Sequence, residues 1–274
     1  MADGTYHRLF DLAGKTAVIT GACGILGRRF ATGLAEFGAA VALVDLDQGT
    51  ADTLAGEIEA RYGVRARGIG CDIADPAAVR AMAEKVEATL GAPAILMNNA
   101  ASKGTDLDAF FAPVEQFDLA TWREIMAVNL DGMFLVAQAI GTGMAERRRG
   151  SIIQTASIYG VVAPDQRIYE GSLYNGRGIN TPAVYSASKA GVIGLSRHLA
   201  TYWGHRGVRV NTLTPGGVAS GQNDEFARRY SARVPMGRMA EADDLVGTAV
   251  FLASDASRYV NGQNIIVDGG LSAW

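Results

Sequence analysis

The sequence predicts a doubly wound α/β domain, in which helices cover both faces of a parallel β-sheet. Short runs rich in β-branched residues alternate with longer amphipathic segments along the chain, and this alternation is typical of such domains. Several runs are apolar almost throughout, as expected for strands that are buried on both faces. The expected strands are 16–20, 40–45, 64–70, 94–98, 151–156, 208–213 and 264–268, and the expected helices are 25–38, 48–62, 75–90, 118–147, 183–205 and 241–254.

Residues 1–274 are predicted to form a single domain, because no linker, internal repeat or low-complexity tract divides them. The formal net charge of −3 comes without a basic stripe, so we expect no nucleic-acid partner. No stretch approaches the roughly 18 apolar residues of a membrane span, and the first residues lack an apolar signal segment. We therefore expect no membrane partner and a cytoplasmic location.

Cysteine and histidine usage points to no metal site. The two cysteines, Cys23 and Cys71, are too few for a disulfide framework and lie at no metal-ligand spacing. The three histidines have no partners at zinc-binding intervals. The expected metal content is none.

A glycine-rich turn follows the first predicted strand and opens the first predicted helix. Glycines at 21, 24 and 27 allow a tight turn and let backbone N–H groups approach a pyrophosphate at the helix N-terminus. This strand–turn–helix context predicts a Rossmann-type dinucleotide site. The turn residues expected to contact the cofactor are Gly21, Cys23, Gly24, Ile25, Leu26 and Gly27.

An acidic residue stands where such a site binds the adenosine ribose. Asp45 ends the second predicted strand, 18 positions beyond Gly27. A carboxylate there accepts hydrogen bonds from both ribose hydroxyls and repels a 2′-phosphate. Leu46 follows it, where an arginine would favour the phosphorylated cofactor. The sequence therefore predicts NAD as the cofactor.

Tyr185 and Lys189 lie four residues apart at the start of a predicted helix, and therefore on one face of it. A tyrosine with an ordinary pKa of about 10 is a poor base at neutral pH. An ammonium group one helical turn away stabilises the phenolate and lowers that pKa. Ser157, which follows a predicted strand, completes the candidate catalytic set.

Together these motifs resemble the short-chain dehydrogenase/reductase family from Lys15 to the C-terminus. The matching landmarks are the 20–27 turn, Asp72 after the third strand, the Asn98-Asn99-Ala100-Ala101 run, Asn129, Ser157, the Tyr185/Lys189 pair and the segment starting Pro215-Gly216-Gly217-Val218. The resemblance implies that Tyr185 is the general acid/base and that Ser157 binds the substrate oxygen. It further implies that Lys189 binds the nicotinamide ribose and that Asn129 holds a water joining Lys189 to solvent.

The resemblance also assigns the rest of the cofactor site. Asp72 and Ile73 would contact the adenine, and Asn98, Asn99 and Ala100 would form the floor of the cofactor cleft. The 215–220 segment would hold the nicotinamide carboxamide, through Pro215, Gly216, Val218 and Ser220. A homotetramer built on the helices at 118–147 and 183–205 is implied as well.

The chain departs from the family pattern at four places. The glycine turn reads GxxGxxG, which resembles the longer sugar-nucleotide branch of the superfamily, and Ala101 replaces a glycine. Ser220 stands where a threonine is usual and keeps a hydroxyl. The gap between Ser157 and Tyr185 is 28 residues, about twice what this family generally shows, and the excess is an irregular loop at 164–182.

This 164–182 loop is expected to form one wall of the substrate pocket, because both its ends lie beside catalytic residues. Together with the residues before it, the sequence of this loop resembles that of family members from bacterial sugar and cell-surface glycan metabolism. Its polar side chains suit a hydroxyl-rich ligand: Asp165, Gln166, Arg167, Tyr169, Glu170, Asn175, Arg177 and Asn180. The expected substrate contacts are Ser157, Tyr159, Arg167, Tyr169, Arg177 and Gly217. The arginines could pair with an anionic substrate group. A subunit contact or surface elaboration is the alternative role of the loop.

The sequence thus predicts an NAD-dependent oxidoreductase acting on a polar hydroxyl or ketone substrate, a sugar or sugar derivative. One alternative is a reductase of oxoacyl thioesters or other lipophilic ketones, which Asp45 opposes because it disfavours NADPH. The other is a non-catalytic NAD-binding regulator, which the complete Ser/Tyr/Lys/Asn set opposes.

Overall fold

A seven-stranded parallel β-sheet forms the centre of the protein, whose computed structural model describes residues 6–174 and 176–274. The strand order is β3-β2-β1-β4-β5-β8-β9. The strands are β1 (Thr16–Thr20), β2 (Ala40–Asp45), β3 (Ala66–Gly70), β4 (Pro93–Asn98), β5 (Gly150–Thr155), β8 (Val208–Pro215) and β9 (Asn264–Val267). All seven predicted strands are confirmed within two residues at their starts and ends, and so is the doubly wound fold.

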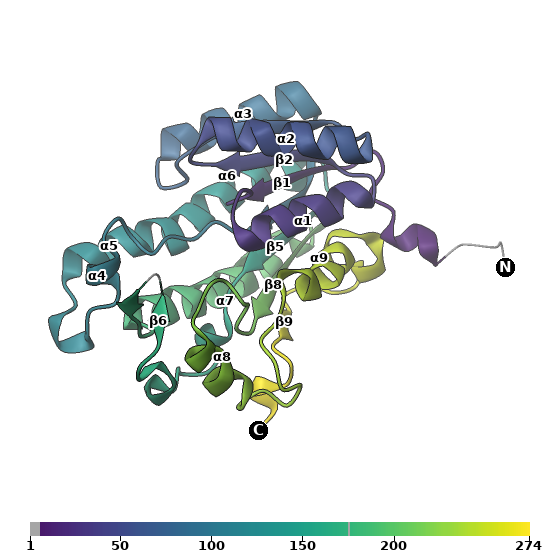
Figure 1. Ribbon diagram of the computed structural model, residues 1–274. Coiled ribbons are helices and arrows are strands. Elements are labelled where there is room, and N and C mark those ends of the chain that lie inside the picture. The colour runs from purple at the N-terminus through teal and green to yellow at the C-terminus, as the bar shows by residue number, and fades with distance from the viewer. Residues whose placement is uncertain (1–5, 175) are drawn as a thin grey trace.

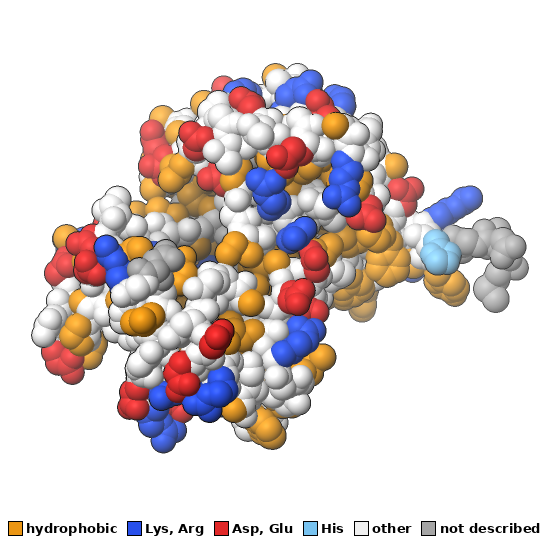
Figure 2. All heavy atoms as spheres, viewed as in Figure 1, with side chains coloured by type: hydrophobic (Ala, Val, Ile, Leu, Met, Phe, Trp, Pro, Cys, Tyr) orange, Lys and Arg blue, Asp and Glu red, His pale blue; other side chains and the backbone are white. Residues whose placement is uncertain are grey.

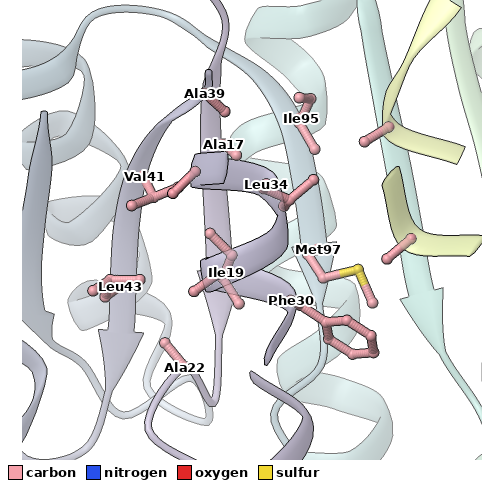
Figure 3. Close-up of a cluster of buried hydrophobic side chains, with 14 of the residues drawn as sticks. Ala17, Ile19, Ala22, Phe30, Leu34, Ala39, Val41, Leu43, Ile95 and Met97 are labelled. Carbon is pink, nitrogen blue, oxygen red and sulfur yellow. The ribbon is translucent and has the colours of Figure 1, made fainter. Parts of the chain in front are cut away.

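Helices cover both faces of the sheet, as Figure 1 shows. One face packs against α1 (Ile25–Glu36), α2 (Gln48–Tyr62) and α9 (Val246–Ala253). The other packs against α3 (Pro76–Leu90), α6 (Met133–Glu146) and α7 (Ala183–Gly204). Phe30 and Leu34 of α1 lie over β1 and β4 in Figure 3. Burial of such large side chains stabilises the fold by about 1.5–3 kcal/mol each.

Capping residues place the helix ends where the sequence pattern predicts them. Asp47 accepts a hydrogen bond from the Thr50 N–H at the start of α2, and Gly63 ends that helix with a φ of 67°. A left-handed C-cap favours glycine because other residues carry a Cβ penalty there. Asp75 caps α3, and Pro76 occupies its first turn, where a missing N–H costs nothing.

The predicted helix at 118–147 is three consecutive segments. α5 (Leu119–Met126) is followed by a π-helical turn, η3 (Ala127–Gly132), and then by α6. By length and composition alone the 28-residue run could cross a membrane. In the fold, however, Ile125 is fully buried beside α7 and Met133 lies in the core. This run therefore serves as a core helix of the domain.

Several short elements were absent from the sequence prediction. The 164–182 loop contains a hairpin of β6 (Leu173–Tyr174) and β7 (Arg177–Gly178), and the helix predicted at 241–254 begins as a 3-10 turn. Two short helices, α4 (Leu107–Phe110) and α8 (Asp224–Ser231), were not expected. The 3-10 turns are η1 (His7–Phe10), η2 (Val114–Gln116), η4 (Ile158–Gly160), η5 (Gln166–Tyr169), η6 (Ala242–Leu245), η7 (Asp255–Ser257) and η8 (Leu271–Ala273).

Three of these added elements, α4, β6 and α8, gather beyond one end of the sheet. Figure 1 shows α4, β6 and α8 at the lower left, past the ends of β5 and β8. Acidic and basic side chains are interspersed over the face drawn in Figure 2. In open α/β sheets the carboxyl ends of the strands are where ligands bind, so α4, β6 and α8 lie beside the candidate site.

The contact between α6 and α7 generates a stability prediction. A Cβ on Gly141 of α6 would lie 2.5 Å from the Trp203 ring of α7. Gly141→Ala should therefore lower the free energy of unfolding by about 1–3 kcal/mol through overpacking. Gly56 in α2 has nothing within 4 Å of its Cβ position, so Gly56→Ala should raise that free energy by about 0.4–1 kcal/mol. Urea unfolding of both variants checks this, and equal effects at the two positions would refute the packing argument.

Candidate active site

Ser157 and Tyr185 meet at the carboxyl edge of the sheet. Ser157 follows β5 and caps the turn η4, where its hydroxyl accepts from the Tyr159 N–H at 3.3 Å. Tyr185 lies in the first turn of α7. Burial raises the pKa of Tyr185 above its ordinary value, while hydrogen bonding with Ser157 opposes this shift. The serine hydroxyl is therefore placed to stabilise negative charge on the phenol oxygen.

Lys189 lies one turn further along α7 and is buried. Its Nζ donates to the Thr155 carbonyl oxygen at 3.0 Å and lies 6.0 Å from the centre of the Tyr185 ring. Burial lowers the pKa of Lys189 to about 8. A desolvated ammonium this close to a phenol favours the phenolate, because the two charges stabilise each other.

Asn129 occupies the π-helical turn η3 and is fully buried. Its Oδ1 accepts from the Ser102 N–H at 2.7 Å, and its Nδ2 donates to the Ser102 carbonyl at 3.1 Å. The side chain therefore fixes the loop after β4 against the helix, a contact that the sequence pattern did not indicate. π-helical turns of this kind are frequent at functional sites.

The glycine turn brings α1 unusually close to β1. A Cβ on Gly27 would lie 1.9 Å from the Gly21 carbonyl oxygen, and one on Gly21 would lie 2.8 Å from the Ala100 Cα. Gly21 also has a φ of 61°, which favours glycine. The result is a cradle with exposed backbone at a helix N-terminus, with Ile25 and Leu26 at its cavity end. These features fit a dinucleotide pyrophosphate.

Thr20 connects this turn to the segment after β4. Its hydroxyl donates to Asn98 Oδ1 at 3.0 Å and accepts from the N–H groups of Asn99 and Ala100, at 2.9 and 3.1 Å. The Asn98 Nδ2 donates in turn to the Met133 carbonyl. The structure therefore brings the two predicted cofactor segments together around one buried hydroxyl.

Asp45 lies at the end of β2 beside the glycine turn. Its carboxylate accepts from the Cys23 N–H at 2.8 Å and from the Leu46 N–H at 2.9 Å. Burial, reinforced by the Asp45 charge, raises the pKa of the Cys23 thiol to about 11. Cys23 is therefore an unreactive thiol, and Asp45 stands where the pattern predicts the ribose carboxylate.

The remaining predicted cofactor residues flank this arrangement. Asp72 accepts from the Ala74 N–H in the turn after β3, and Ile73 is buried against Gly132. Gly217 donates its N–H to the Tyr230 hydroxyl at 2.5 Å, and a Cβ there would collide with the Tyr230 ring. The segment at 215–220 is thereby fixed against α8.

A cavity of about 370 Å³ joins the catalytic and cofactor segments, a size typical of small-molecule sites. Ser157, Tyr185 and Lys189 line it, and so do Asn99 and residues of the 215–220 segment. The 164–182 loop contributes a wall of Tyr169, Tyr174, Ile179, Asn180, Thr181 and Pro182. The position of the loop agrees with the sequence expectation, but much of this wall is aromatic or apolar.

A chain of hydroxyl groups ties the loop to the catalytic segment. Tyr169 donates to the Tyr159 hydroxyl at 3.1 Å, and it shares a hydrogen bond of 2.5 Å with Thr181. All three residues line the cavity. Since Tyr159 lies two residues after Ser157, the chain fixes the loop next to the catalytic serine.

The two loop arginines do not line this cavity, which corrects the expected substrate contacts. Arg167 pairs with Asp165 at 2.8 Å, and its side chain is 85% exposed. Arg177 pairs with Asp108 of α4 at 2.9 Å. Near carboxylates therefore neutralise both guanidinium groups, which the loop sequence alone could not indicate. Asn175, another expected polar residue, lies outside the described residues.

The cavity also includes residues that the sequence reasoning missed. Lys103 follows the Asn98–Ala101 run by two positions, at the same strand edge, and this placement was an available signal. Phe226 and Tyr230 lie four residues apart behind the capping Asn223, which is a helix signal. Phe110, Phe111, Gln222 and Met239 complete the unexpected lining. Within the described residues no cluster of possible metal ligands was found.

Comparisons with known proteins agree with this geometry. The family model described as "short chain dehydrogenase" matches residues 15–230. D-threitol dehydrogenase from Mycolicibacterium smegmatis is 38% identical over 269 residues, which are 95% of this chain and 94% of that protein. Gluconate 5-dehydrogenase from Gluconobacter oxydans is 34% identical and covers 96% of this chain and 97% of its own.

A solved structure resembles the chain equally closely. The gluconate 5-dehydrogenase from Burkholderia cenocepacia, in complex with NADP and tartrate, has a TM-score of 0.85 and 34% identity, covering 97% of this chain and 98% of that one. The family model, the relatives and the solved structure agree on the family and the fold along nearly the entire chain. The protein belongs to the short-chain dehydrogenase family and is an oxidoreductase that acts on CH–OH groups.

Proposed function

We propose that this protein transfers a hydride between NAD and a secondary hydroxyl or ketone group of a polyhydroxylated, sugar-derived substrate. The observation that carries the proposal is the meeting of Ser157, Tyr185 and Lys189 in one cavity with the 215–220 segment. The relatives named as dehydrogenases of threitol and gluconate support the substrate class. The hydroxyls of Tyr159, Tyr169 and Thr181 suit such a ligand, because they can donate and accept hydrogen bonds.

In the proposed oxidation, Tyr185 takes the hydroxyl proton from the carbon that gives up the hydride. Ser157 holds the reacting oxygen, and the Lys189 ammonium lowers the energy of the tyrosinate. Bound NAD would supply the hydride acceptor, and its nicotinamide would lie against the 215–220 segment. Both polar atoms of the Asn129 side chain are hydrogen-bonded to the Ser102 backbone. Asn129 would therefore hold the predicted water with its main-chain carbonyl.

Asp45 leads us to propose NAD rather than NADP, although at least two related structures contain NADP. The carboxylate is available beside the glycine turn to accept from ribose hydroxyls. A 2′-phosphate would face this negative charge directly. The glycine turn, Asp45, Asp72, Ile73 and the segment after β4 would hold the adenosine half.

A second candidate is the reduction of lipophilic ketones or oxoacyl thioesters. The observation that favours it is the apolar part of the cavity lining, which includes Phe110, Phe111, Ile179, Phe226 and Met239. Turnover of acyl-carrier thioesters with NADPH, without turnover of polyols, would favour this candidate. Asp45 opposes it. A non-catalytic regulator remains the weakest alternative, since the catalytic set is assembled.

The quaternary state is also a proposal. We propose a homotetramer in which the run α5–η3–α6 and helix α7 meet their counterparts. Phe134 and Tyr202 on these helices are 41% and 58% exposed, and a neighbouring subunit would cover such apolar surface. Light scattering after size-exclusion chromatography measures the mass. The cytoplasmic location stays a prediction from the sequence.

The first prediction of the proposal concerns cofactor choice. NAD should be preferred over NADP by roughly 2–4 kcal/mol in kcat/KM, from ribose hydrogen bonds and like-charge repulsion. Asp45→Ala should reduce the difference in kcat/KM between the two cofactors, mainly by lowering kcat/KM for NAD. Initial rates with both cofactors check it, and equal kcat/KM values in the unmodified enzyme would refute the role of Asp45.

The second prediction concerns the acid/base. Tyr185→Phe should lower kcat by about 10²–10⁴-fold, while NAD affinity measured by calorimetry stays nearly constant, because only a hydroxyl is lost. Lys189→Ala should weaken both turnover and NAD binding. If Tyr185→Phe kept turnover within about threefold of the unmodified enzyme, against the loss expected of a general base, another group would have to carry the proton.

A further inference from the structure

We infer that Lys103 forms an anion subsite in the catalytic cavity, so that the substrate is a polyhydroxylated compound with a carboxylate or phosphate group. The inference rests on the proposed function and sharpens its substrate class. Lys103 lines the cavity, whereas the two loop arginines are paired outside it. We therefore assign the binding of an anionic substrate group to Lys103 and not to these arginines.

The charged side chains that line the cavity in the described part of the chain are both basic. Among the residues that the structure describes, Lys103 and Lys189 line the cavity, and no aspartate or glutamate does. Lys189 is buried and donates to the Thr155 carbonyl beside the reacting tyrosine. Lys103 is exposed and comes from the loop after β4. A ligand with a negative group is therefore favoured over a neutral one of equal shape.

The hairpin of the 164–182 loop fixes the position of the Lys103 ammonium. Its Nζ lies 4.0 Å from the centre of the Tyr174 ring, a cation–π contact. Tyr174 itself is bridged to Gln222, and the Leu173 carbonyl accepts from the Asn223 N–H. The backbone that carries this ring is thus anchored on the segment before α8, and the cation–π contact places the ammonium at the cavity wall.

Nearby carboxylates are engaged elsewhere. Glu124 accepts from the Thr105 N–H at 2.8 Å, and Asp108 pairs with Arg177. Within the described residues no ion pair involves Lys103. The ammonium therefore keeps its donors available for a ligand, and a carboxylate or phosphate is the partner that uses them best.

Besides the Lys103 ammonium, the amide oxygen of Asn180 is a polar group of the cavity lining that favours a hydroxylated ligand. Asn180 donates its Nδ2 to the Phe111 carbonyl at 2.7 Å, which orients the amide. Its Oδ1 is buried and has no hydrogen-bond partner among residues 6–174 and 176–274, and the residue lines the cavity. An unsatisfied buried acceptor is costly, and a substrate hydroxyl would satisfy it. An acid that also carries hydroxyls meets both requirements.

The test compares substrates that differ only in charge. An aldonate, the alditol of the same carbon chain and a phosphate monoester of that alditol are assayed for NAD reduction with the unmodified enzyme, Lys103→Met and Lys103→Arg. Arg167→Met is the matched control, because it removes the same charge from the 164–182 loop, at a side chain that does not line the cavity. The quantity measured is the ratio of kcat/KM for each anion to that for the alditol.

We expect this ratio to exceed one in the unmodified enzyme for at least one anion and to fall about 10-fold in Lys103→Met, through KM. Lys103→Arg and Arg167→Met should keep it. Turnover of the alditol with no Lys103-dependent preference for either anion would overturn the inference and leave the proposed function standing. Absence of NAD reduction with all three probes would count against the proposed function itself.

Discussion

The close approach of Gly27 to the Gly21 carbonyl is the constraint on which the rest of the site depends. No side chain larger than hydrogen fits there, because its Cβ would lie 1.9 Å from the oxygen. This contact sets the N-terminus of α1 over the end of β1, and Phe30 and Leu34 then anchor the helix on the sheet (Figure 3). The N–H groups in the first turn of α1, which begins at Ile25, are thereby placed where a pyrophosphate would bind.

The proposed catalysis depends on a second constraint, the placement of Tyr185 and Lys189 on one face of α7 beside the cavity. Without cofactor or substrate, burial raises the pKa of the tyrosine and lowers that of the lysine to about 8, so each group alone disfavours its charged form. The pair favours charge only together, since phenolate and ammonium stabilise one another at short range. In the proposed mechanism, proton transfer at Tyr185 is thus linked to the charge on Lys189.

Local patterns were enough to predict the sheet and the glycine turn, and to select the candidate residues Ser157, Tyr185 and Lys189 that the structure brings into one cavity. Each depends on neighbours in sequence: alternating apolar runs, glycine spacing, and a tyrosine and lysine one helical turn apart. The substrate wall was harder, because it depends on pairings between distant residues. Arg177 is neutralised by Asp108, and Lys103 meets Tyr174 only after the hairpin folds over the site. No local pattern contains these contacts. The π-helical turn at Asn129 was missed for the same reason, as its amide binds Ser102 from another segment.

We propose above that this cavity oxidises a polyhydroxylated compound with NAD. The most direct measurement is the appearance of NADH when the enzyme and NAD are supplied with a panel of alditols, sugars, aldonates and acyl thioester reference compounds. The account predicts NADH formation with at least one polyhydroxylated secondary alcohol. Turnover confined to acyl thioesters, or tight NAD binding without turnover of any member of the panel, would contradict it.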